Sequence, residues 1–359
     1  MQQTLPDAPL DIIGDIHGEL DALHALLHHL GYRDGRHPQG RRLVFVGDLC
    51  DRGPDSPGSI ALVQSLVESG QAYAVMGNHE LNLLRGDRKD GNNWFWDVDN
   101  PDEDKFEPYR RVDPDQRQGI LAFLAQLPLV LQREDLRIVH AAWHESAASR
   151  LLTRSDEPLL ALFDEWEDAT DTRLQESGLL AESDAEINEW SDALTSEGTS
   201  VPLLAAKGRS DEFRQMGNPL RVLTSGVERL ASGSFYTGGK WRFTQRVKWW
   251  DHYQSDIPVV IGHYWRQFYP VGLAGLGKGD SDIFAGLAPT DWHGARGNVF
   301  CVDFCVGGRY QERRKGVTAY KTKLVALRWP ERTLVLDSGE VVDSTCYEKQ
   351  ALDKHRSIS

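Results

Sequence analysis

Three short polar motifs follow one another at nearly equal intervals in the first quarter of the chain. They are Gly14–Gly18 (GDIHG), Gly47–Gly53 (GDLCDRG) and Gly77–Glu80 (GNHE). An apolar run that predicts a β-strand precedes each motif, and apolar residues at helical spacing follow it. A βαβ repeat returns alternate loops to one edge of a sheet, and open α/β sheets build their sites at the carboxyl ends of strands. The motifs therefore predict an α/β fold with a polar site at that edge.

The same patterns locate the remaining elements. We expect strands at 10–13, 43–46, 72–76, 129–132, 136–140, 257–261, 299–303, 324–328 and 333–336. We expect helices at 19–30, 58–69, 80–84 and 116–126. Gly31 and Gly70 lie where the first two helices should end.

Length and cysteine content limit the class of protein. A chain of 359 residues can bury a large core without disulfides. Its four cysteines form neither a paired framework nor a Cys-x-x-Cys motif, which favours a reducing compartment. No run of about eighteen apolar residues is present, and the polar start lacks the form of a secretory signal. We therefore expect a soluble, cytoplasmic protein that does not bind membranes.

The charge of the chain argues against one class of substrate. The formal net charge is −14, whereas binding to nucleic acid depends on lysine and arginine that neutralise phosphates. A long nucleic acid is therefore a poor candidate. A small phosphate ester remains possible, because bound divalent cations reverse the local potential.

The side chains of the three motifs suit a pair of divalent metal ions. Two cations about 3.5–4 Å apart can clamp a phosphate and activate a shared water. Asp15 and His17 lie two residues apart on one turn and can reach one ion, while Asp48 can bridge both. Asn78 offers a neutral oxygen to the second ion.

Later histidines can complete the second ion's ligands. His140 and His263 each end a predicted apolar strand, although His144, His252 and His293 compete for the same role. Mixed oxygen and nitrogen ligands suit Mn²⁺, Fe or Zn²⁺ better than Ca²⁺.

These motifs resemble those of the calcineurin-like metallophosphoesterases. Asp51–Ser56 (DRGPDS) and Gly77–Glu80 (GNHE) are most similar to the phosphoprotein-phosphatase-like branch, which includes bacterial Ser/Thr phosphatases and relatives of dinucleoside tetraphosphatases. The motifs cover residues 11–85, with isolated matches at His140 and at Gly262–His263. The resemblance implies a two-sheet sandwich flanked by helices in four layers, αββα, with a dinuclear site on loops at one edge.

Carried over by position, the resemblance also implies a role for each site residue. One set of side chains would hold the first ion: Asp15, His17 and Asp48. Another would hold the second: Asp48, Asn78, His140 and His263. His79 would be the general acid, oriented by Asp51, and Arg52 would clamp phosphate oxygens in a bidentate manner. Two divalent ions are expected as cofactors, manganese first, with Fe, Zn or Mg as alternatives.

The chain also departs from its relatives. It has His140–Trp143 (HAAW) where many protein phosphatases have His-Gly-Gly. It has Asp51–Gly53 (DRG) and Asn78–Glu80 (NHE) where dinucleoside tetraphosphatases usually have Ala-Arg-Gly and Asn-His-Asp, which argues against a strict tetraphosphatase assignment. For a second phosphate-binding arginine, no motif chooses between Arg266 and Arg309.

We expect one metallophosphoesterase domain over residues 1–345 and a C-terminal tail at 346–359. The domain should contain a long loop at 86–115 and a mainly helical, acidic insertion at about 151–250. Aromatic runs are candidates either for stacking on a nucleobase or for packing in the core or a lid: Trp94–Trp96, Trp249–Trp250 and Tyr264–Trp265.

The function expected from these features is hydrolysis of phosphomonoesters by a metal-bridging hydroxide, with His79 as general acid. The alternatives are a nucleotide or dinucleoside polyphosphate hydrolase, and a catalytically silent scaffold that binds proteins. The substrate would be a phosphorylated small molecule, a nucleotide or a phosphoprotein.

Overall fold

The computed structural model of the protein describes residues 1–97, 104–271 and 282–345. Its internal contacts divide the chain into two units. The sheet unit comprises residues 1–141, 250–270 and those from 287 on, and the helical unit comprises residues 142–249 and 271–286. The tail expected at 346–359 lies outside the described residues, and the single domain expected over 1–345 stays a prediction.

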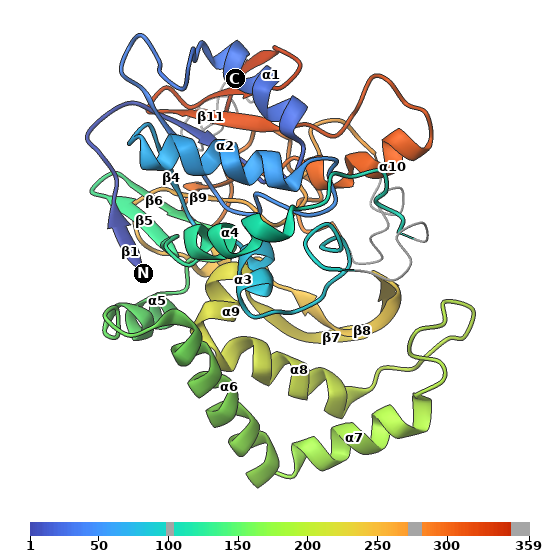
Figure 1. The fold of residues 1–359 in the computed structure, drawn as a ribbon. Coiled ribbons are helices and arrows are strands. Elements are labelled where there is room, and N and C mark those ends of the chain that lie inside the picture. The colour runs from blue at the N-terminus through green and yellow to red at the C-terminus, as the bar shows by residue number, and fades with distance from the viewer. Residues whose placement is uncertain (98–103, 272–281, 346–359) are drawn as a thin grey trace, which may run out of the picture. The chain divides into compact units, whose positions relative to one another are not determined.

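One sheet of the sheet unit carries the three motifs (Figure 1). It has six strands in the order β13-β12-β11-β2-β3-β4. The strands are β2 (Leu10–Ile13), β3 (Arg42–Phe45), β4 (Ala72–Ala74), β11 (Val325–Trp329), β12 (Thr333–Leu336) and β13 (Val341–Asp343). Strands β2, β3 and β4 are parallel, and β11 joins β2 in antiparallel fashion. The parallel strands therefore end at the same edge, as the motif spacing predicts.

The second sheet has five strands in the order β1-β5-β6-β9-β10. They are β1 (Gln2–Thr4), β5 (Val130–Arg133), β6 (Leu136–Val139), β9 (Val259–Ile261) and β10 (Val299–Cys301). Strands β6, β9 and β10 are parallel to one another. Leu10 and Ile12 of the first sheet share a fully buried cluster with Ile138 and Val260 of the second. The predicted α/β fold with two sheets and flanking helices is confirmed.

Local signals explain how the helices of this unit begin and end. Helix α1 (Leu20–Leu30) ends at Gly31, whose φ of 93° favours glycine. Helix α2 (Ser56–Glu68) begins two residues before its predicted start, because the Asp55 side chain accepts the Gly58 N–H and caps it. The others are α3 (Asn78–Leu84), η2 (Pro114–Gln116), α4 (Arg117–Leu124), η5 (Val306–Gly308) and α10 (Arg309–Arg314).

The long loop expected at 86–115 contains no helix or strand in its described parts until the short helix η2. It is nevertheless well packed, because Trp94 and Phe95 are buried.

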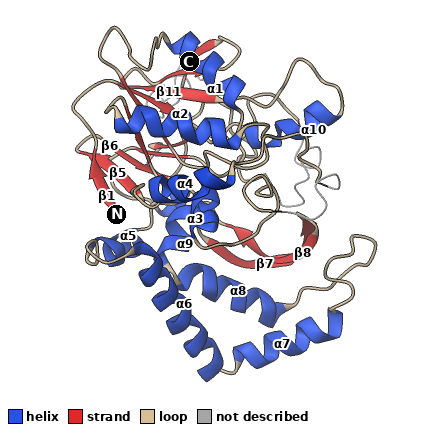
Figure 2. Ribbon diagram, viewed as in Figure 1, coloured by secondary structure: helices blue, strands red, loops and turns tan. Residues whose placement is uncertain are grey.

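The helical unit contains five helices and one hairpin within the described residues (Figure 2). They are α5 (Glu145–Leu152), α6 (Leu159–Glu176), α7 (Leu179–Trp190), α8 (Ala205–Gly217), α9 (Pro219–Ser225), β7 (Glu228–Thr237) and β8 (Lys240–Arg246); the short helix η3 (Trp249–His252) follows where the chain leaves the unit. Helix α8 lies against the hairpin at Gly208, where a Cβ would lie 2.8 Å from the Phe243 carbonyl oxygen. The sequence patterns did not predict the hairpin.

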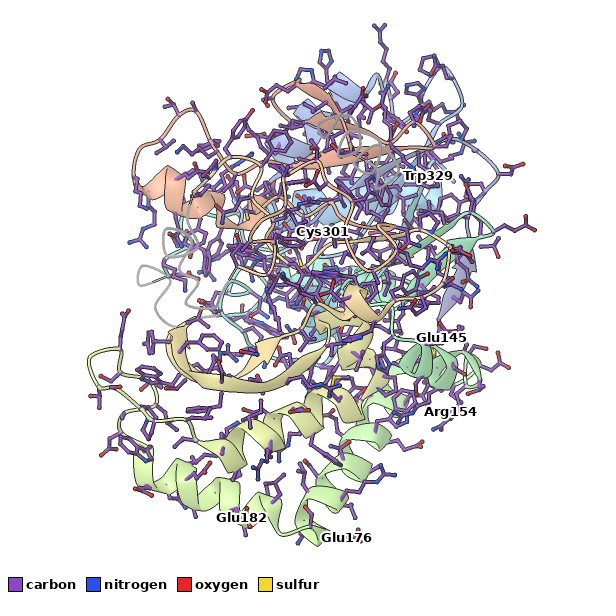
Figure 3. All side chains as sticks on the ribbon, turned by 180° about the vertical axis from the view of Figure 1, so that it is seen from behind. Glu145, Arg154, Glu176, Glu182, Cys301 and Trp329 are labelled. Atoms are coloured by element: carbon purple, nitrogen blue, oxygen red, sulfur yellow. The ribbon has the colours of Figure 1, made fainter. Side chains whose placement is uncertain are left out.

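The acidic side chains of the helical unit include Glu176 and Glu182, which are exposed on α6 and α7 (Figure 3). An exposed acidic face needs no ligand to explain it. Among the described residues, the structure has no helix with the length and apolar character needed to span a bilayer.

Candidate active site

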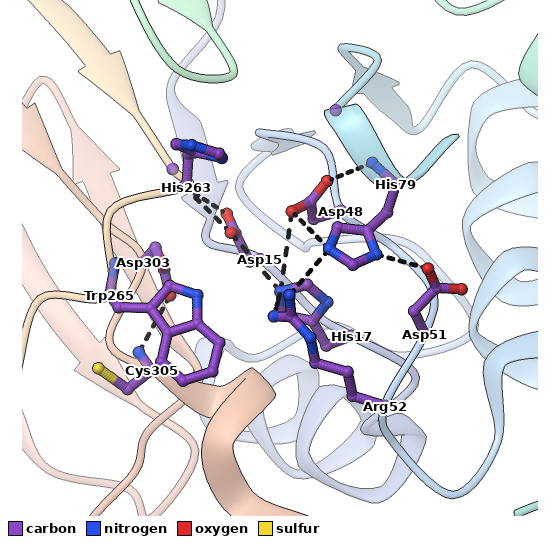
Figure 4. A network of polar contacts seen from close by, with 12 residues as sticks. Asp15, His17, Asp48, Asp51, Arg52, His79, His263, Trp265, Asp303 and Cys305 are labelled. Atoms are coloured by element: carbon purple, nitrogen blue, oxygen red, sulfur yellow. Dashed lines mark hydrogen bonds and ion pairs between the residues drawn. The ribbon is translucent and has the colours of Figure 1, made fainter. Parts of the chain in front are cut away.

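The predicted metal ligands lie at the ends of five strands in the sheet unit. Figure 4 labels four of them: Asp15, His17, Asp48 and His263. Three of these strands belong to the six-stranded sheet: Asp15 and His17 follow β2, Asp48 follows β3, and Asn78 follows β4. The other two belong to the five-stranded sheet: His140 follows β6, and His263 follows β9. All of these side chains are buried except that of Asn78, which is half-buried.

Asp48 lies between two groups of nitrogen donors. Its Oδ2 is 3.7 Å from His17 Nε2 and 3.8 Å from His79 Nε2, whereas its Oδ1 is 3.4 Å from His140 Nε2. Asp15 Oδ2 lies 3.9 Å from His17 Nε2. The two oxygens of Asp48 thus face different groups, which is the geometry expected of a bridging carboxylate.

The second group of donors, around His140 and His263, also includes an amide oxygen. Asn78 Oδ1 lies 3.3 Å from His140 Nε2 and 2.9 Å from His263 Nδ1. The ligand atoms of Asp48, His140 and His263 all lie within 4.8 Å of one another, as do those of His17, Asp48 and His79. Such buried sets of carboxylate, amide and imidazole donors fit divalent transition metals.

Backbone carbonyls orient two of these imidazoles. The Nδ1 of His17 is 3.0 Å from the Cys50 oxygen, and the Nδ1 of His140 is 2.7 Å from the Val46 oxygen. An N–H donated at Nδ1 leaves the Nε2 lone pair for another partner, which is the usual arrangement of histidines that bind metals. Both Nε2 atoms indeed face the site.

Burial and neighbouring charges perturb the ionisation of these groups. Burial lowers the pKa of His17 well below its usual value, and the positive charge of Arg52 adds to this shift. Burial opposes the charged forms of His140 and Asp48, but their mutual attraction outweighs it. This attraction raises the pKa of His140 to about 10 and holds the pKa of Asp48 well below its usual value. Burial raises the pKa of Asp15 well above normal, as does nearby Asp303.

The three predicted catalytic residues, Asp51, Arg52 and His79, lie on the same side of Asp48 as His17. His79 Nδ1 lies 2.5 Å from Asp51 Oδ2, and Arg52 donates to the Nε2 atoms of His17 and His79, each at 3.0 Å. The guanidinium carbon of Arg52 is 5.0 Å from the centre of the Trp265 ring. The arrangement can present a guanidinium fork and an imidazole to one anion.

Glu80 joins the second and third motifs. Its carboxylate accepts the backbone N–H groups of Asp48, Leu49 and Gly77, each at 2.8 Å. It is fully buried. Glu80 therefore fixes the loop that carries Asp48 relative to the start of α3.

The turn that carries His263 is held by two carboxylates. His263 and Trp265 have φ values of 71° and 56°, which side-chain-bearing residues adopt uncommonly. Asp15 Oδ2 accepts the His263 N–H at 3.0 Å, and Asp303 Oδ2 accepts the Trp265 N–H at 2.7 Å. Sequence reasoning missed Asp303, because the strand predicted at 299–303 ends at Cys301. An acidic residue just after a strand, as at Asp15 and Asp48, was the available signal.

The other candidates have different roles. Arg266 donates to the carbonyls of Ala288 and Asp291, and Arg309 to the Thr322 carbonyl and the Asp337 carboxylate, so both guanidinium groups are engaged by protein acceptors. Of the competing histidines, His144 caps α5 and His293 packs on Trp250; neither these nor His252 belongs to the two ligand groups among the described residues.

The aromatic runs pack in the interior. Six of their side chains are buried: Trp94, Phe95, Trp249, Trp250, Tyr264 and Trp265. These residues fit the packing alternative rather than a platform for a nucleobase.

Comparison with known proteins adds to this geometry. Residues 8–174 match the family model described as calcineurin-like phosphoesterase. The asymmetrical bis(5'-nucleosyl)-tetraphosphatase PrpE of Oceanobacillus iheyensis is 50% identical over 80 residues, which are 21% of this chain and 32% of the relative. The symmetrical bis(5'-nucleosyl)-tetraphosphatase of Ralstonia nicotianae is 43% identical over 81 residues, 23% of this chain and 26% of the relative. The chain thus spans about a quarter to a third of the length of these relatives.

Two solved structures are also similar. A metallophosphoesterase from Sphaerobacter thermophilus has 25% identity and a TM-score of 0.26, covering 38% of this chain and 47% of the other. The cold-active protein-tyrosine phosphatase of a Shewanella species has 15% identity and a TM-score of 0.40, covering 94% of this chain and 82% of the other.

Proposed function

We propose that this chain, whose residues 8–174 belong to the calcineurin-like phosphoesterase family, is a phosphoric ester hydrolase that requires two divalent metal ions. The observation that carries the proposal is the position of Asp48. One of its oxygens faces His17 and the other faces His140, and these two histidines belong to different groups of donors. Asp15, His17 and Asp48 would hold one ion. Four side chains would hold the other: Asp48, Asn78, His140 and His263.

When bound, two divalent cations would supply Lewis acidity toward phosphate oxygens and a nucleophile drawn from water. The oxygen and nitrogen donors suit manganese, and iron, zinc or magnesium are the alternatives. We also propose a reducing, cytoplasmic compartment, which the buried, reduced thiols of Cys50, Cys301 and Cys305 support.

Arg52 is the proposed phosphate clamp. Its two terminal nitrogens donate to His17 and His79, so the fork already points at the site where an anion would lie. A phosphate can take both donors through two oxygens, which lysine cannot match. The Trp265 ring beside the guanidinium favours this orientation.

His79 is the proposed proton donor to the leaving oxygen. Asp51 holds its Nδ1, which directs Nε2 toward Asp48 and Arg52. Once Arg52 turns its donors to phosphate, Nε2 is free to carry the proton that the departing alkoxide needs. This intact set of groups favours an enzyme over the silent scaffold.

Phosphomonoesters are the substrate class that we propose first. A dinucleoside polyphosphate is the second candidate, because the relatives named above are bis(5'-nucleosyl)-tetraphosphatases. The burial of Trp94, Tyr264 and Trp265 leaves these rings without an open face for a nucleobase, which favours the first class.

The test is turnover by metal-stripped protein after Mn²⁺, Zn²⁺ or Mg²⁺ is restored. The substrates are p-nitrophenyl phosphate, bis-p-nitrophenyl phosphate and diadenosine tetraphosphate. We expect metal-dependent hydrolysis, and His79→Asn should lower it most, by roughly 10²-fold, for a substrate with a poor leaving group such as phenyl phosphate. His24→Asn, at an exposed position on α1, is the matched control and should behave as wild type. Bound metal with no turnover of any substrate would instead favour the scaffold.

A further inference from the structure

The loop that follows α3 returns to the second motif and contacts Asp51. The indole Nε1–H of Trp94 donates to Asp51 Oδ1 at 2.6 Å, while Asp51 Oδ2 lies 2.5 Å from His79 Nδ1. Asp51 is fully buried, and Trp94 is only 2% exposed. One buried carboxylate therefore connects the tryptophan to the proposed general acid, as seen for Asp51 and His79 in Figure 4.

The same loop is attached to the motif at a second point. The backbone N–H of Arg52 donates to the Gly91 carbonyl at 3.0 Å. At Gly91, φ is 98° and a Cβ would lie 2.9 Å from Arg52 Cγ, so only glycine allows this approach without strain. The Val112 N–H donates to the Trp94 carbonyl at 2.9 Å, which also fixes the backbone of the tryptophan. Backbone hydrogen bonds thus fix the loop both at Gly91, before Trp94, and at Trp94 itself.

The chemistry of a buried carboxylate explains why this contact matters. A carboxylate removed from water needs hydrogen-bond donors on its oxygens, and the terminal torsion of an aspartate is broad when nothing restrains it. With Trp94 on Oδ1 and His79 on Oδ2, the plane of the carboxylate is set by two rings. Loss of the indole donor would leave Asp51 Oδ1 without a hydrogen bond and allow the carboxylate to rotate.

We infer that Trp94 is a positioning residue, whose indole N–H fixes Asp51 so that Asp51 can orient His79 for proton transfer. This inference rests on the proposed function. It also gives the loop at 86–97 a role in the chemistry through a residue that lies outside all three motifs.

Trp94→Phe tests the inference, because it keeps an aromatic ring and removes the donor. The readout compares phenyl phosphate with p-nitrophenyl phosphate. Phenol is the poorer leaving group, so its departure depends more on proton donation. We expect kcat for phenyl phosphate to fall roughly tenfold, kcat for p-nitrophenyl phosphate to fall less than about threefold, and KM to stay unchanged.

Trp96→Phe is the matched control. Trp96 lies in the same loop, and its indole donates to Asn92 Oδ1 at 3.0 Å rather than to Asp51. Loss of this donor should leave the ratio of the two kcat values as in wild type. A general loosening of the loop would change both variants alike.

Two further variants separate positioning from stability. Because the ratio is taken within one preparation, it does not depend on the folded fraction. Trp94→His carries a ring nitrogen the same number of bonds from Cβ as the indole nitrogen, so it should restore part of the ratio. In a His79→Asn background, Trp94→Phe should cause no further loss, since the group that it positions is gone.

The outcomes are distinct. Active wild type with the selective loss in Trp94→Phe alone supports the inference. Equal losses on both substrates, or the same change in Trp96→Phe, overturn it while the proposed function stands. Wild type that turns over neither these two phenyl esters nor bis-p-nitrophenyl phosphate nor diadenosine tetraphosphate with any of the three metals overturns both.

Discussion

The carboxylate of Glu80 accepts the backbone N–H of Asp48 at 2.8 Å, so the third motif holds in place the residue that faces both groups of proposed metal ligands. The same carboxylate also binds the N–H groups of Leu49 and Gly77. These hydrogen bonds therefore join the two motifs into one piece.

Glu80→Gln should weaken this piece. The amide replaces one acceptor oxygen by a donor that faces backbone N–H groups, so buried donors lose their partner. We expect a loss of about 1–3 kcal/mol in the free energy of unfolding, measured by chemical denaturation of metal-free protein. Glu68→Gln, an exposed position on α2, should change it by less than about 0.5 kcal/mol. Equal effects of the two substitutions would contradict the role given to Glu80.

The metal stoichiometry should depend on which ligand is removed. His263→Asn removes a donor from the second group only and should leave about one ion per chain, whereas Asp48→Asn affects both groups and should leave fewer. Elemental analysis after dialysis at the lowest metal concentration that fills both sites of wild type distinguishes these results. Full occupancy of two sites in Asp48→Asn would rule out a bridging role.

The metal-free protein should lose stability as the pH rises above neutrality. Asp48 raises the pKa of folded His140 to about 10, above the unfolded value of about 6.5. The contribution of this pair is therefore fully present below pH ~6.5 and is lost as pH rises toward ~10. The lowered pKa of His17 acts below this window, because an unfolded histidine is already neutral above it.

Thermal unfolding between pH 7 and 9 checks this dependence. Chelated protein should show a falling Tm. Protein saturated with Mn²⁺ should show a flatter or rising one, because metal binding requires neutral His140 and is stronger at higher pH. A Tm of the chelated protein that rises over this range would show that another group dominates.

Arg52→Lys should damage phosphate binding although the charge is kept. Lysine offers neither the two-pronged fork nor the flat face that lies beside Trp265. We expect kcat/KM to fall roughly 10²-fold in steady-state assays. Arg110→Lys, at an exposed ion pair with Asp55, should leave it unchanged. An active Arg52→Lys enzyme would show that phosphate is clamped by another group.

Gly262→Ala should displace Asp15 and so distort the site. A Cβ there would lie 2.1 Å from Asp15 Oδ1 and 2.8 Å from Val46 Cγ2, so the first aspartate would have to move. Metal affinity should fall by about tenfold or more, as measured by titration with a chelating dye. Gly119→Ala on α4, where nothing lies within 4 Å, should leave affinity unchanged and raise stability by up to about 1 kcal/mol. Unchanged affinity in Gly262→Ala would show that Asp15 tolerates the shift.

The sequence predicts what depends on local pattern. The strands at 10–13 and 333–336 have the expected bounds, and the ligand candidates lie at strand ends because apolar runs and turn residues mark those ends clearly. Strand β1 was not predicted: its three residues are exposed, and it exists through parallel pairing with β5, far along the chain. The β7–β8 hairpin has a polar, half-buried pattern that gives no clear period.

Contacts made across loops could not be predicted from the sequence either. The link from Trp94 to Asp51 crosses an irregular segment whose path no periodicity describes. Asp303 went unrecognised because the end of β10 was placed two residues too late. In both cases the missing information was the position of a loop, since the residue types themselves were visible.

The pairing of β6 with β9 has a consequence for the order of assembly. These strands are neighbours, and the Gly262 N–H donates to the His140 carbonyl at 2.8 Å, yet roughly 120 residues of chain separate them. The turns bearing Asp15, Asp48 and Asn78 come from one short stretch and need only local closure. We therefore expect a nascent chain to form the turns with Asp15, Asp48 and Asn78 early. The pairing that brings His140 and His263 together can form only after the intervening polypeptide has emerged and its long loop has closed.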